Sequence, residues 1–248
     1  MKLSKLNSII IVSIIFEIFV CSCAKQNPEK IQEWEGQVAP TFIFRTISIP
    51  ERMRQSPDSM AQRVVEYVDL NNECTEYRPY LIPPEDYSTK TAKGPPWITT
   101  WNSPKGYMIF LTIDGEVGGS SFTWEVKFWG TDSTKGAYYH RWIFIEADQA
   151  AADKIGGIRV YKENTTNLAC YYNWVTFHDE FIYTTSILDG DSISLVLEFH
   201  IYHGLAGDLF QTRENYGLEY KFSWNIDGSG QWWKYDDQFN VMDSGSWN

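Results

Sequence analysis

Hydrophobic and polar residues alternate with a period of two along most of the chain after residue 106. In the segment 122–128, aromatic and aliphatic residues at even positions are separated by threonine, glutamate and lysine at odd positions. The same alternation recurs in the segments 192–202 and 218–226. This period is typical of strands with one buried and one solvated face, so the pattern predicts a β-sheet with a core on one side.

Turn signals between these segments predict how the strands are connected. Asp114-Gly115, Asp189-Gly190 and Asp227-Gly228 accept the positive φ that a tight hairpin needs, so neighbouring strands should be antiparallel. We expect a mainly β (α+β) fold, in which an antiparallel meander over 106–248 forms a curved sheet or a barrel-like sandwich of about nine strands. The predicted strands are 107–113, 122–128, 138–147, 156–162, 168–177, 192–202, 218–226, 231–235 and 239–247.

The region before the meander predicts a strand, a helix and a long connection. Apolar residues on both sides of an extended chain predict a strand over 41–49. Ser56-Pro57-Asp58 has the form of a helix start, and the apolar stripe that follows predicts one helix over about 57–70, packed on the sheet. Prolines at 79, 83, 84, 95, 96 and 104 predict a connection without regular structure over 78–104.

The first 40 residues differ from the rest. Lys2 and Lys5 precede an apolar run over 9–20 that is too short to span a bilayer, which is typical of a signal peptide over 1–22. Residues 23–40 are polar and predict a tether. No charge block divides the remainder, so 41–248 should form a single β-rich domain.

The apolar run ends in Val20-Cys21-Ser22-Cys23, which resembles the lipobox of bacterial lipoproteins. The resemblance implies cleavage before Cys23 and acylation of its thiol, which would anchor the chain in a lipid bilayer. Glu17 departs from the usual pattern, because a charge interrupts the apolar run. Ala24, in place of aspartate, resembles lipoproteins sorted to an outer membrane, so we expect a cell-envelope protein facing the periplasm or the surface. The alternative is ordinary secretion with cleavage after Ala24, with Asn164-Thr165-Thr166 as a glycosylation acceptor.

The formal net charge is -11, and no cluster of lysine and arginine occurs. Nucleic acid and anionic headgroups are therefore poor partners for this chain, since binding of phosphates requires clustered cations. Cys74 and Cys170 remain after processing, and they either form one disulfide or are two buried thiols.

No motif identifies a catalytic, metal or cofactor site. Gly-x-Ser-x-Gly and Cys-x-x-Cys are absent, and Gly156-Gly157 precedes a strand where a phosphate loop would precede a helix. His200 and His203 should point to opposite faces of a strand, so they cannot bind one metal ion together. We expect no cofactor, and the sequence leaves open whether the protein is an enzyme.

Aromatic residues make up 16% of the chain, with 11 tryptophans. Most should pack in the core, but rings on a solvated face can bind sugars or apolar ligands. Trp129 continues the polar side of its strand. Trp232 and Trp233 are adjacent, so one of them must leave the core, and Tyr138, His140 and Trp142 should share one face of their strand. The candidate binding residues are Trp129, Tyr138, His140, Trp142, Trp232 and Trp233.

Two classes of function remain. The first is a non-enzymatic ligand-binding β domain displayed on a membrane, whose aromatic rings bind a carbohydrate or a small apolar ligand. The alternative is a structural or assembly lipoprotein that binds another envelope protein through a strand edge or a flat apolar patch. A hydrolase is a more distant alternative. It stays open because the two carboxylates of a glycosidase have no fixed sequence spacing by which they could be identified.

Overall fold

The computed structural model describes residues 39–85, 87, 94–115, 120–150, 154–178, 180–190, 192–202, 205–214 and 217–248. The predicted signal peptide, Cys23 and nearly all of the predicted tether lie outside these residues, as does His203. Among the helices of the described ranges, none has the length and apolar character needed to cross a membrane.

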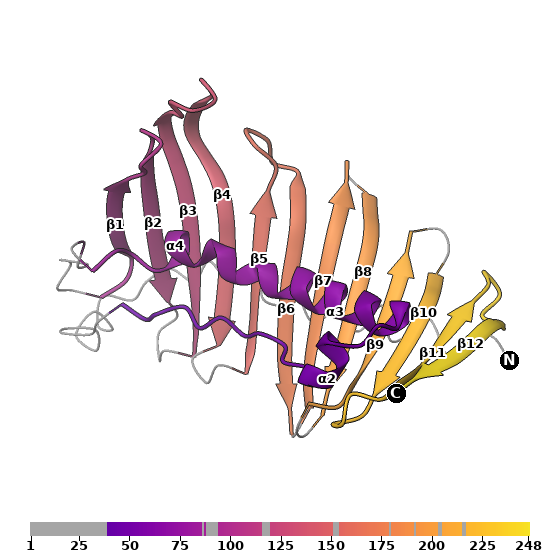
Figure 1. Ribbon diagram of the computed structural model, residues 1–248. Coiled ribbons are helices and arrows are strands. Elements are labelled where there is room, and N and C mark those ends of the chain that lie inside the picture. Colours follow the sequence, from indigo (N-terminus) through magenta and orange to yellow (C-terminus); the bar gives the residue numbers. More distant parts are fainter. Residues whose placement is uncertain are drawn as a thin grey trace, which may run out of the picture. The chain divides into compact units, whose positions relative to one another are not determined.

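The described residues form one antiparallel sheet of 12 strands, in which each strand pairs with its neighbours in the chain (Figure 1). The meander is therefore as predicted, but it has 12 strands instead of about nine, and it is open, with β1 and β12 at its two edges. The strands are β1 (Trp97–Asn102), β2 (Met108–Gly115), β3 (Ser121–Thr131), β4 (Tyr138–Ala150), β5 (Ile155–Tyr161), β6 (Leu168–Phe177), β7 (Glu180–Asp189), β8 (Ser192–Ile201), β9 (Gly207–Arg213), β10 (Gly217–Trp224), β11 (Gly230–Tyr235) and β12 (Val241–Trp247).

Three of these strands were not predicted. β1 lies inside the segment 78–104, whose prolines stand before and after the strand and not within it. The prediction that 78–104 lacks regular structure is therefore wrong. In β7 and β9 the buried positions include Thr185 and Gln211, which are both fully buried. These polar residues interrupt the apolar alternation on which the strand predictions depended.

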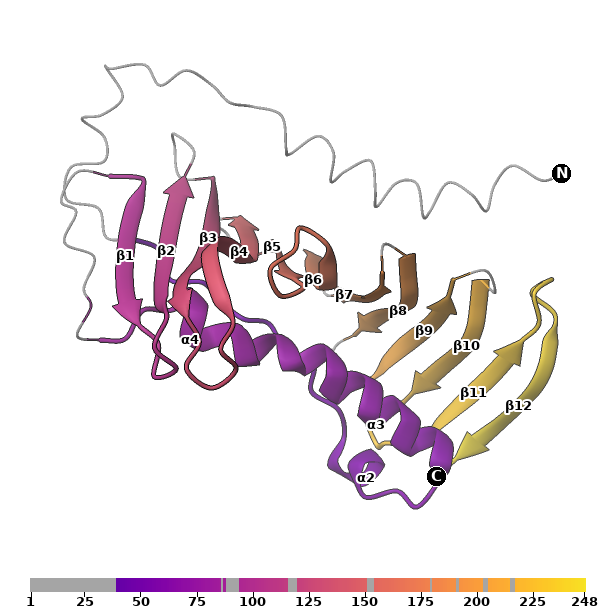
Figure 2. The ribbon, with the colours of Figure 1, turned by 90° about the horizontal axis from the view of Figure 1, so that it is seen from above.

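Within residues 39–85, four helical segments precede the sheet, namely α2 (Glu51–Arg54), α3 (Ser59–Asn72), the 3-10 helix η2 (Glu73–Tyr77) and α4 (Arg78–Leu81). α3 corresponds to the predicted helix, and the Asp58 carboxylate caps it by accepting hydrogen bonds from the backbone N–H groups of Met60 and Ala61. Its buried residues include Val64 and Val68, which belong to the predicted stripe. Figures 1 and 2 show α3 lying across one face of the sheet, here called the covered face; the opposite face is the outer face.

Polar side chains fix α3 on the covered face. The Thr185 hydroxyl donates to Asn71 Oδ1 at 2.7 Å, and the Tyr67 hydroxyl donates to Gln211 Oε1 at 2.8 Å. The Arg63 guanidinium lies 4.3 Å from the centre of the Tyr220 ring. Thr185 and Gln211, the buried polar residues that interrupt the apolar pattern of β7 and β9, therefore hydrogen-bond to α3, because a buried polar group needs a partner.

The segment 39–50 also lies on the covered face, but it does not pair with any strand that the structure describes. The prediction of a strand over 41–49 is wrong. Side chains bind its backbone instead: the Gln149 amide bonds both polar groups of Ile43, and the Asn72 amide bonds both polar groups of Ile47. The Phe42 ring packs edge-on against Trp124 and Trp174, which explains the apolar character of this segment.

Glycines make room for tryptophans in the core. Four tryptophans each lie against the glycine that stands opposite them on the neighbouring strand. The contact is so close that a Cβ added to the glycine would overlap the indole ring. The four pairs are Trp174 with Gly156, Trp224 with Gly207, Trp247 with Gly230 and Trp232 with Gly245. Three of these tryptophans are at most 3% exposed. Glycine within a strand thus marks a close approach of a ring.

Candidate functional site

A cavity of about 360 Å³ lies on the covered face where three hairpin turns meet α4. The turns connect β1 to β2, β3 to β4 and β5 to β6, and in an antiparallel meander alternate turns lie at the same end of the sheet. We call this cavity the turn pocket. Its lining residues are Tyr80, Lys105, Tyr107, Phe128, Asp132, Lys135, Tyr139, Trp142, Phe144, Val160, Tyr161, Lys162, Glu163 and Ala169.

The wall of the turn pocket is aromatic. The Tyr139 and Trp142 ring centres are 5.3 Å apart, and those of Phe128 and Phe144 are 4.8 Å apart. Tyr80 of α4 contacts the Phe144 ring edge-on at 5.0 Å, so the helical layer supplies part of the wall. Phe128 and Tyr139 are at most 4% exposed, whereas Tyr80, Trp142 and Phe144 are half-buried and are the rings on which a flat or ring-shaped ligand could stack.

Hydrogen bonds join the three turns that form the rim. The Ser133 hydroxyl and backbone N–H both donate to the carbonyl of Lys105, at 2.8 and 2.7 Å. Lys135 Nζ lies 3.1 Å from Glu163 Oε2. The Trp142 indole N–H donates to the Thr165 carbonyl at 3.2 Å. The rim is therefore one connected structure, although its residues come from turns that are distant in the sequence.

Both acids of the rim are held in the ionised form. The Tyr139 hydroxyl donates to Glu163 Oε1 at 2.7 Å, and this bond, together with Lys135, lowers the pKa of Glu163. Asp132 accepts from the Thr134 hydroxyl and from backbone N–H groups, which lowers its pKa. Burial raises the pKa of Tyr80 to about 12, so its hydroxyl remains a donor. Near neutral pH the pocket offers carboxylate acceptors, ammonium donors and phenol donors, but neither carboxyl group can serve as a general acid.

Of the predicted binding residues, only Trp142 lines the turn pocket. The prediction that Tyr138, His140 and Trp142 share one face is wrong for Trp142, because a register shift between β3 and β4, at Phe128 and Trp129, places one extra residue between His140 and Trp142. Arg141, with φ of 51°, lies between His140 and Trp142 at this shift. As a result Trp142 packs against Phe128 on the covered face, whereas His140 pairs with Trp129 on the outer face.

The remaining predicted residues form two separate groups. The Trp129 and His140 rings contact each other on the outer face with their centres 4.9 Å apart and their planes tilted by 39°, and Tyr138 is 54% exposed. At the other end of the sheet, Trp232 lies against Gly245 on the covered face, and Trp233 lies on the outer face with Lys221 Nζ 5.5 Å from its ring centre. The structure thus does not bring the six predicted residues into one site.

Sequence reasoning missed most of the turn pocket, although a signal was present. Ser103-Pro104-Lys105-Gly106 and Ser133-Thr134-Lys135-Gly136 are two similar turn sequences, each followed closely by tyrosine. Because they occupy alternate hairpins, they come to the same end of the sheet. The aromatic wall could not be found in this way, since Tyr80 comes from a helix that the prolines concealed.

A second charged cluster lies on the outer face around His200. Its Nδ1 is 2.6 Å from Glu180 Oε1, and its Nε2 is 2.8 Å from Glu198 Oε1. The hydrogen bond with Glu198, followed by that with Glu180, raises the pKa of His200. Asp208 stands opposite His200 in the register, but the described part of the chain contains no group of three acid, histidine or cysteine side chains arranged to bind a metal ion.

Cys74 and Cys170 are free thiols in the structure, and Cys74 is buried whereas Cys170 is half-buried. Cys74 Sγ lies 3.7 Å from the Arg45 carbonyl, and Cys170 Sγ lies 3.7 Å from the Tyr77 hydroxyl. Burial raises the pKa of Cys74 to about 12 and also raises that of Cys170. Both groups are protonated at neutral pH and are therefore poor nucleophiles.

Comparison of the sequence with protein-family models and with curated proteins finds no match. The geometry of the sheet and of the turn pocket therefore carries the functional conclusion.

Proposed function

We propose that this protein is an exported, lipid-anchored binding domain of the cell envelope that holds a carbohydrate in the turn pocket. The observation that carries the proposal is the combination of an aromatic wall with a rim of paired charges in one cavity. Its volume of about 360 Å³ is within the range of roughly 300–1,000 Å³ that is usual for small-molecule sites.

The chemistry of the pocket favours a neutral polar ring over an ion or a purely apolar ligand. The half-buried Trp142 ring offers a flat surface for the C–H face of a sugar, and the buried Tyr139 ring packs against it. Lys135 with Glu163 and Lys105 with Asp132 offer donors and acceptors to hydroxyl groups, and with Lys162 the lining carries three cations and two anions. A neutral ligand with many hydroxyl groups can satisfy both signs, whereas an ion of either sign would meet like charges as well as opposite ones.

The same electrostatics favours binding over hydrolysis. A glycosidase needs one protonated carboxyl group with a raised pKa beside an ionised one. In the turn pocket the pKa values of Asp132 and Glu163 are both lowered. We therefore propose a binding role for this pocket and not a catalytic one.

The test is calorimetric titration of the full-length chain in detergent micelles with a panel of neutral mono- and oligosaccharides. We expect at least one sugar to bind with an affinity that is nearly unchanged between low salt and about half-molar salt, because stacking is screened much less than ion pairing. If no sugar binds, or if the only binding disappears at the higher salt concentration, the proposal is wrong.

Support for the anchor lies in the first 23 residues, and it can be tested separately. Replacing Cys23 by Ala should prevent acylation and move the protein from the membrane fraction to the soluble fraction after a high-salt wash. Cys21→Ala is the matched control, because Cys21 precedes the expected cleavage site and should leave the protein in the membrane fraction. A Cys23→Ala protein that still sediments with membranes would contradict the lipoprotein assignment.

A second candidate function, assembly with another envelope protein, is favoured by the edge strand β12. Val241 is 53% exposed and Met242 67% exposed, and Asp243 is the only charged residue of the strand. An exposed strand edge with few charges is a template for pairing with another chain. A photo-crosslinking residue at Ser246 should capture a distinct partner in membranes if this function is correct, and the same residue at Thr176, within the central strand β6, should not.

A further inference from the structure

The segment 39–50, here called the strap, crosses the covered face as an extended chain and pairs with none of the strands that the structure describes (Figure 1). Side chains bind its backbone where a neighbouring strand would otherwise do so. The Gln149 amide accepts from the N–H of Ile43 at 3.0 Å and donates to the carbonyl of the same residue at 2.9 Å. The Asn72 amide binds Ile47 in the same way, with both bonds 2.8 Å long. The strap is therefore held through its main chain, as a bound peptide is.

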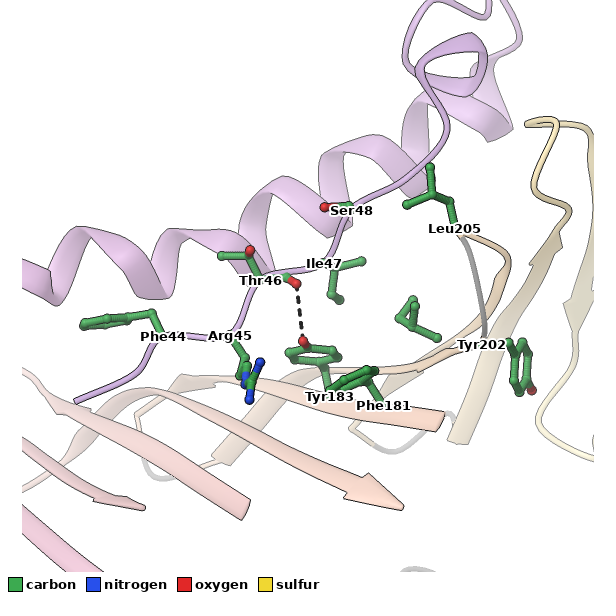
Figure 3. Close-up of a pocket in the computed structure, with 10 residues that line it drawn as sticks. Phe44, Arg45, Thr46, Ile47, Ser48, Phe181, Tyr183, Tyr202 and Leu205 are labelled. Carbon is green, nitrogen blue, oxygen red and sulfur yellow. Dashed lines mark hydrogen bonds between the residues drawn. The ribbon is translucent and has the colours of Figure 1, made fainter. Parts of the chain in front are cut away.

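An aromatic contact fixes the register of the strap. Phe42 is 1% exposed and packs edge-on against Trp124 and Trp174, whose ring centres lie 5.0 and 5.7 Å away. Farther along the strap, the Tyr183 hydroxyl donates to the Thr46 carbonyl at 3.3 Å, a bond drawn as a dashed line in Figure 3. These contacts specify one extended sequence. We call the side chains that make them the seat; they are Asn72, Trp124, Gln149, Trp174 and Tyr183.

The seat is held in position by contacts that do not involve the strap. Asn72 belongs to α3, which is fixed on the sheet by the hydrogen bonds of Thr185 with Asn71 and of Tyr67 with Gln211. The other four side chains of the seat belong to β3, β4, β6 and β7. The seat would therefore stay in place if the strap left it.

An empty seat would be unfavourable, because the rings of Phe42, Trp124 and Trp174 would all meet water. The strap of a second copy restores each of these contacts, since it has the same sequence. Exchange of an identical element between two copies keeps the buried surface and the hydrogen bonds of the monomer, which makes it a low-cost route to a dimer.

The connection between the strap and α2 can serve as the hinge of such an exchange. α2 stays with its own copy, because Met53 is fully buried and a Cβ added to Gly228 of the β10–β11 turn would lie 3.0 Å from the Met53 nitrogen. Pro50 precedes α2 with ψ of 135°, and a proline restricts the residue before it, here Ile49, to extended conformations. The strap thus joins α2 in the extended form that reaching a second copy requires.

We propose that the strap exchanges between two copies of this chain, so that each strap occupies the seat of the other copy. The partner is a second copy because its strap matches the aromatic contact at Phe42 and the amide contacts at Ile43 and Ile47 together. Exchange of the strap requires neither the turn pocket, nor a sugar, nor the lipid anchor.

The test uses the full-length chain in detergent micelles, prepared in an unlabelled and an isotope-labelled form that both carry a diazirine-bearing aliphatic residue in place of Ile43. The two forms are mixed in equal amounts at high concentration, incubated, separated by size-exclusion chromatography and irradiated. In the dimer fraction we expect cross-links between strap and seat peptides, of which about half join a labelled to an unlabelled peptide, as random exchange between two copies requires.

Synthetic peptides of residues 39–50, added before incubation, show whether the copies meet at the seat. The wild-type peptide should suppress the mixed cross-links. A Phe42→Ala peptide should need a concentration at least about tenfold higher for the same effect, because it lacks the ring that packs on the two tryptophans. An Ile43→Ala peptide is the matched control and should act like the wild type, since the Ile43 side chain is 45% exposed.

The same experiment has outcomes that would overturn the proposal. They are absence of a dimer, strap–seat cross-links within one isotope form only, and mixed cross-links that the wild-type peptide suppresses no better than the Phe42→Ala peptide. Uptake of the wild-type peptide by a chain that stays monomeric would also overturn it, in favour of a seat that binds an extended segment of another protein.

Discussion

The two faces of the sheet use the same residue types for different purposes. On the covered face, Trp97, Trp124 and Trp174 are at most 2% exposed and form the core under α3 and the segment 39–50. On the outer face, Trp129 and Trp233 are half-buried and lie beside cations, Arg141 at 5.5 Å and Lys221 at 5.5 Å from the ring centres. Aromatic content alone therefore says little about function, because the face decides whether a ring is core or surface.

The comparison also explains why the turn pocket is unusual. It lies on the covered face, where rings are normally sealed by helix or by glycine contacts, yet Trp142 and Tyr139 border a cavity. The bulge of β4 at Arg141 moves Trp142 to this face and leaves His140 on the other. A functional site thus arises where the strand departs from its regular period.

The largest effect should come from a cavity in the covered face. Leu197 is fully buried in β8, whereas its neighbour Val196 is half-buried on the outer face. Leu197→Ala should lower the free energy of unfolding by about 2–5 kcal/mol, and Val196→Ala by about 1 kcal/mol. Urea denaturation of both variants measures the difference. A loss below about half a kcal/mol for Leu197→Ala would mean that the two faces are assigned the wrong way round.

Two adjacent glycines of β5 give a smaller but sharper contrast. A Cβ at Gly156 would overlap the buried Trp174 ring on the covered face, whereas a Cβ at Gly157 would meet chiefly the Asn173 amide on the outer face. The ring cannot move without disturbing the core, but the amide can turn away. Gly156→Ala should therefore cost about 1–3 kcal/mol and Gly157→Ala less, measured by the same denaturation. Equal losses would show that the tryptophan–glycine contacts are not specific to the core.

The smallest effect concerns the outer-face cluster around His200. Its pKa is raised by Glu198 and Glu180, so the protonated form stabilises the fold. This contribution is complete below the ordinary histidine value of about 6.5 and is lost as the pH rises through the raised value. Denaturation between about pH 5.5 and 8.5 should show a decline of at most about 1 kcal/mol, which His200→Gln abolishes. A decline of equal size in His200→Gln would assign the pH dependence to another group.

The sequence predicted the elements whose periods are regular. In β8, Leu197 and Phe199 are fully buried as expected, but Leu195 and Ile201 are half-buried and Ile193 is 45% exposed, so the alternation holds only in the middle of the strand. The buried residues of α3 include Val64, Val65 and Val68 of the predicted stripe. Two of the three additional strands, β7 and β9, were not predictable from period alone, because Thr185 and Gln211 place polar groups in the core, and the prolines on either side of β1 concealed that strand. The partners of Thr185 and Gln211, which are Asn71 and Tyr67, are more than a hundred residues away along the chain.

The site was less predictable than the fold for the same reason. Trp142 was identified as a candidate, but with the wrong neighbours, since a period of two cannot reveal the bulge at Arg141. The wall residue Tyr80 and the rim residue Glu163 come from elements whose proximity depends on the whole meander. Alternate turns come to the same end of the sheet because each strand pairs with its neighbours in the chain.

The central claim is that the covered-face tryptophan of β4, and not its outer-face neighbour on β3, contacts a sugar. Trp142→Ala and Trp129→Ala each remove one indole, and both can be titrated by calorimetry with the sugar that the wild-type chain binds best. We expect Trp142→Ala to weaken binding by about tenfold or more, as for loss of a stacked ring, and Trp129→Ala to leave it unchanged. Unchanged binding in Trp142→Ala, or a greater loss in Trp129→Ala, would contradict the account.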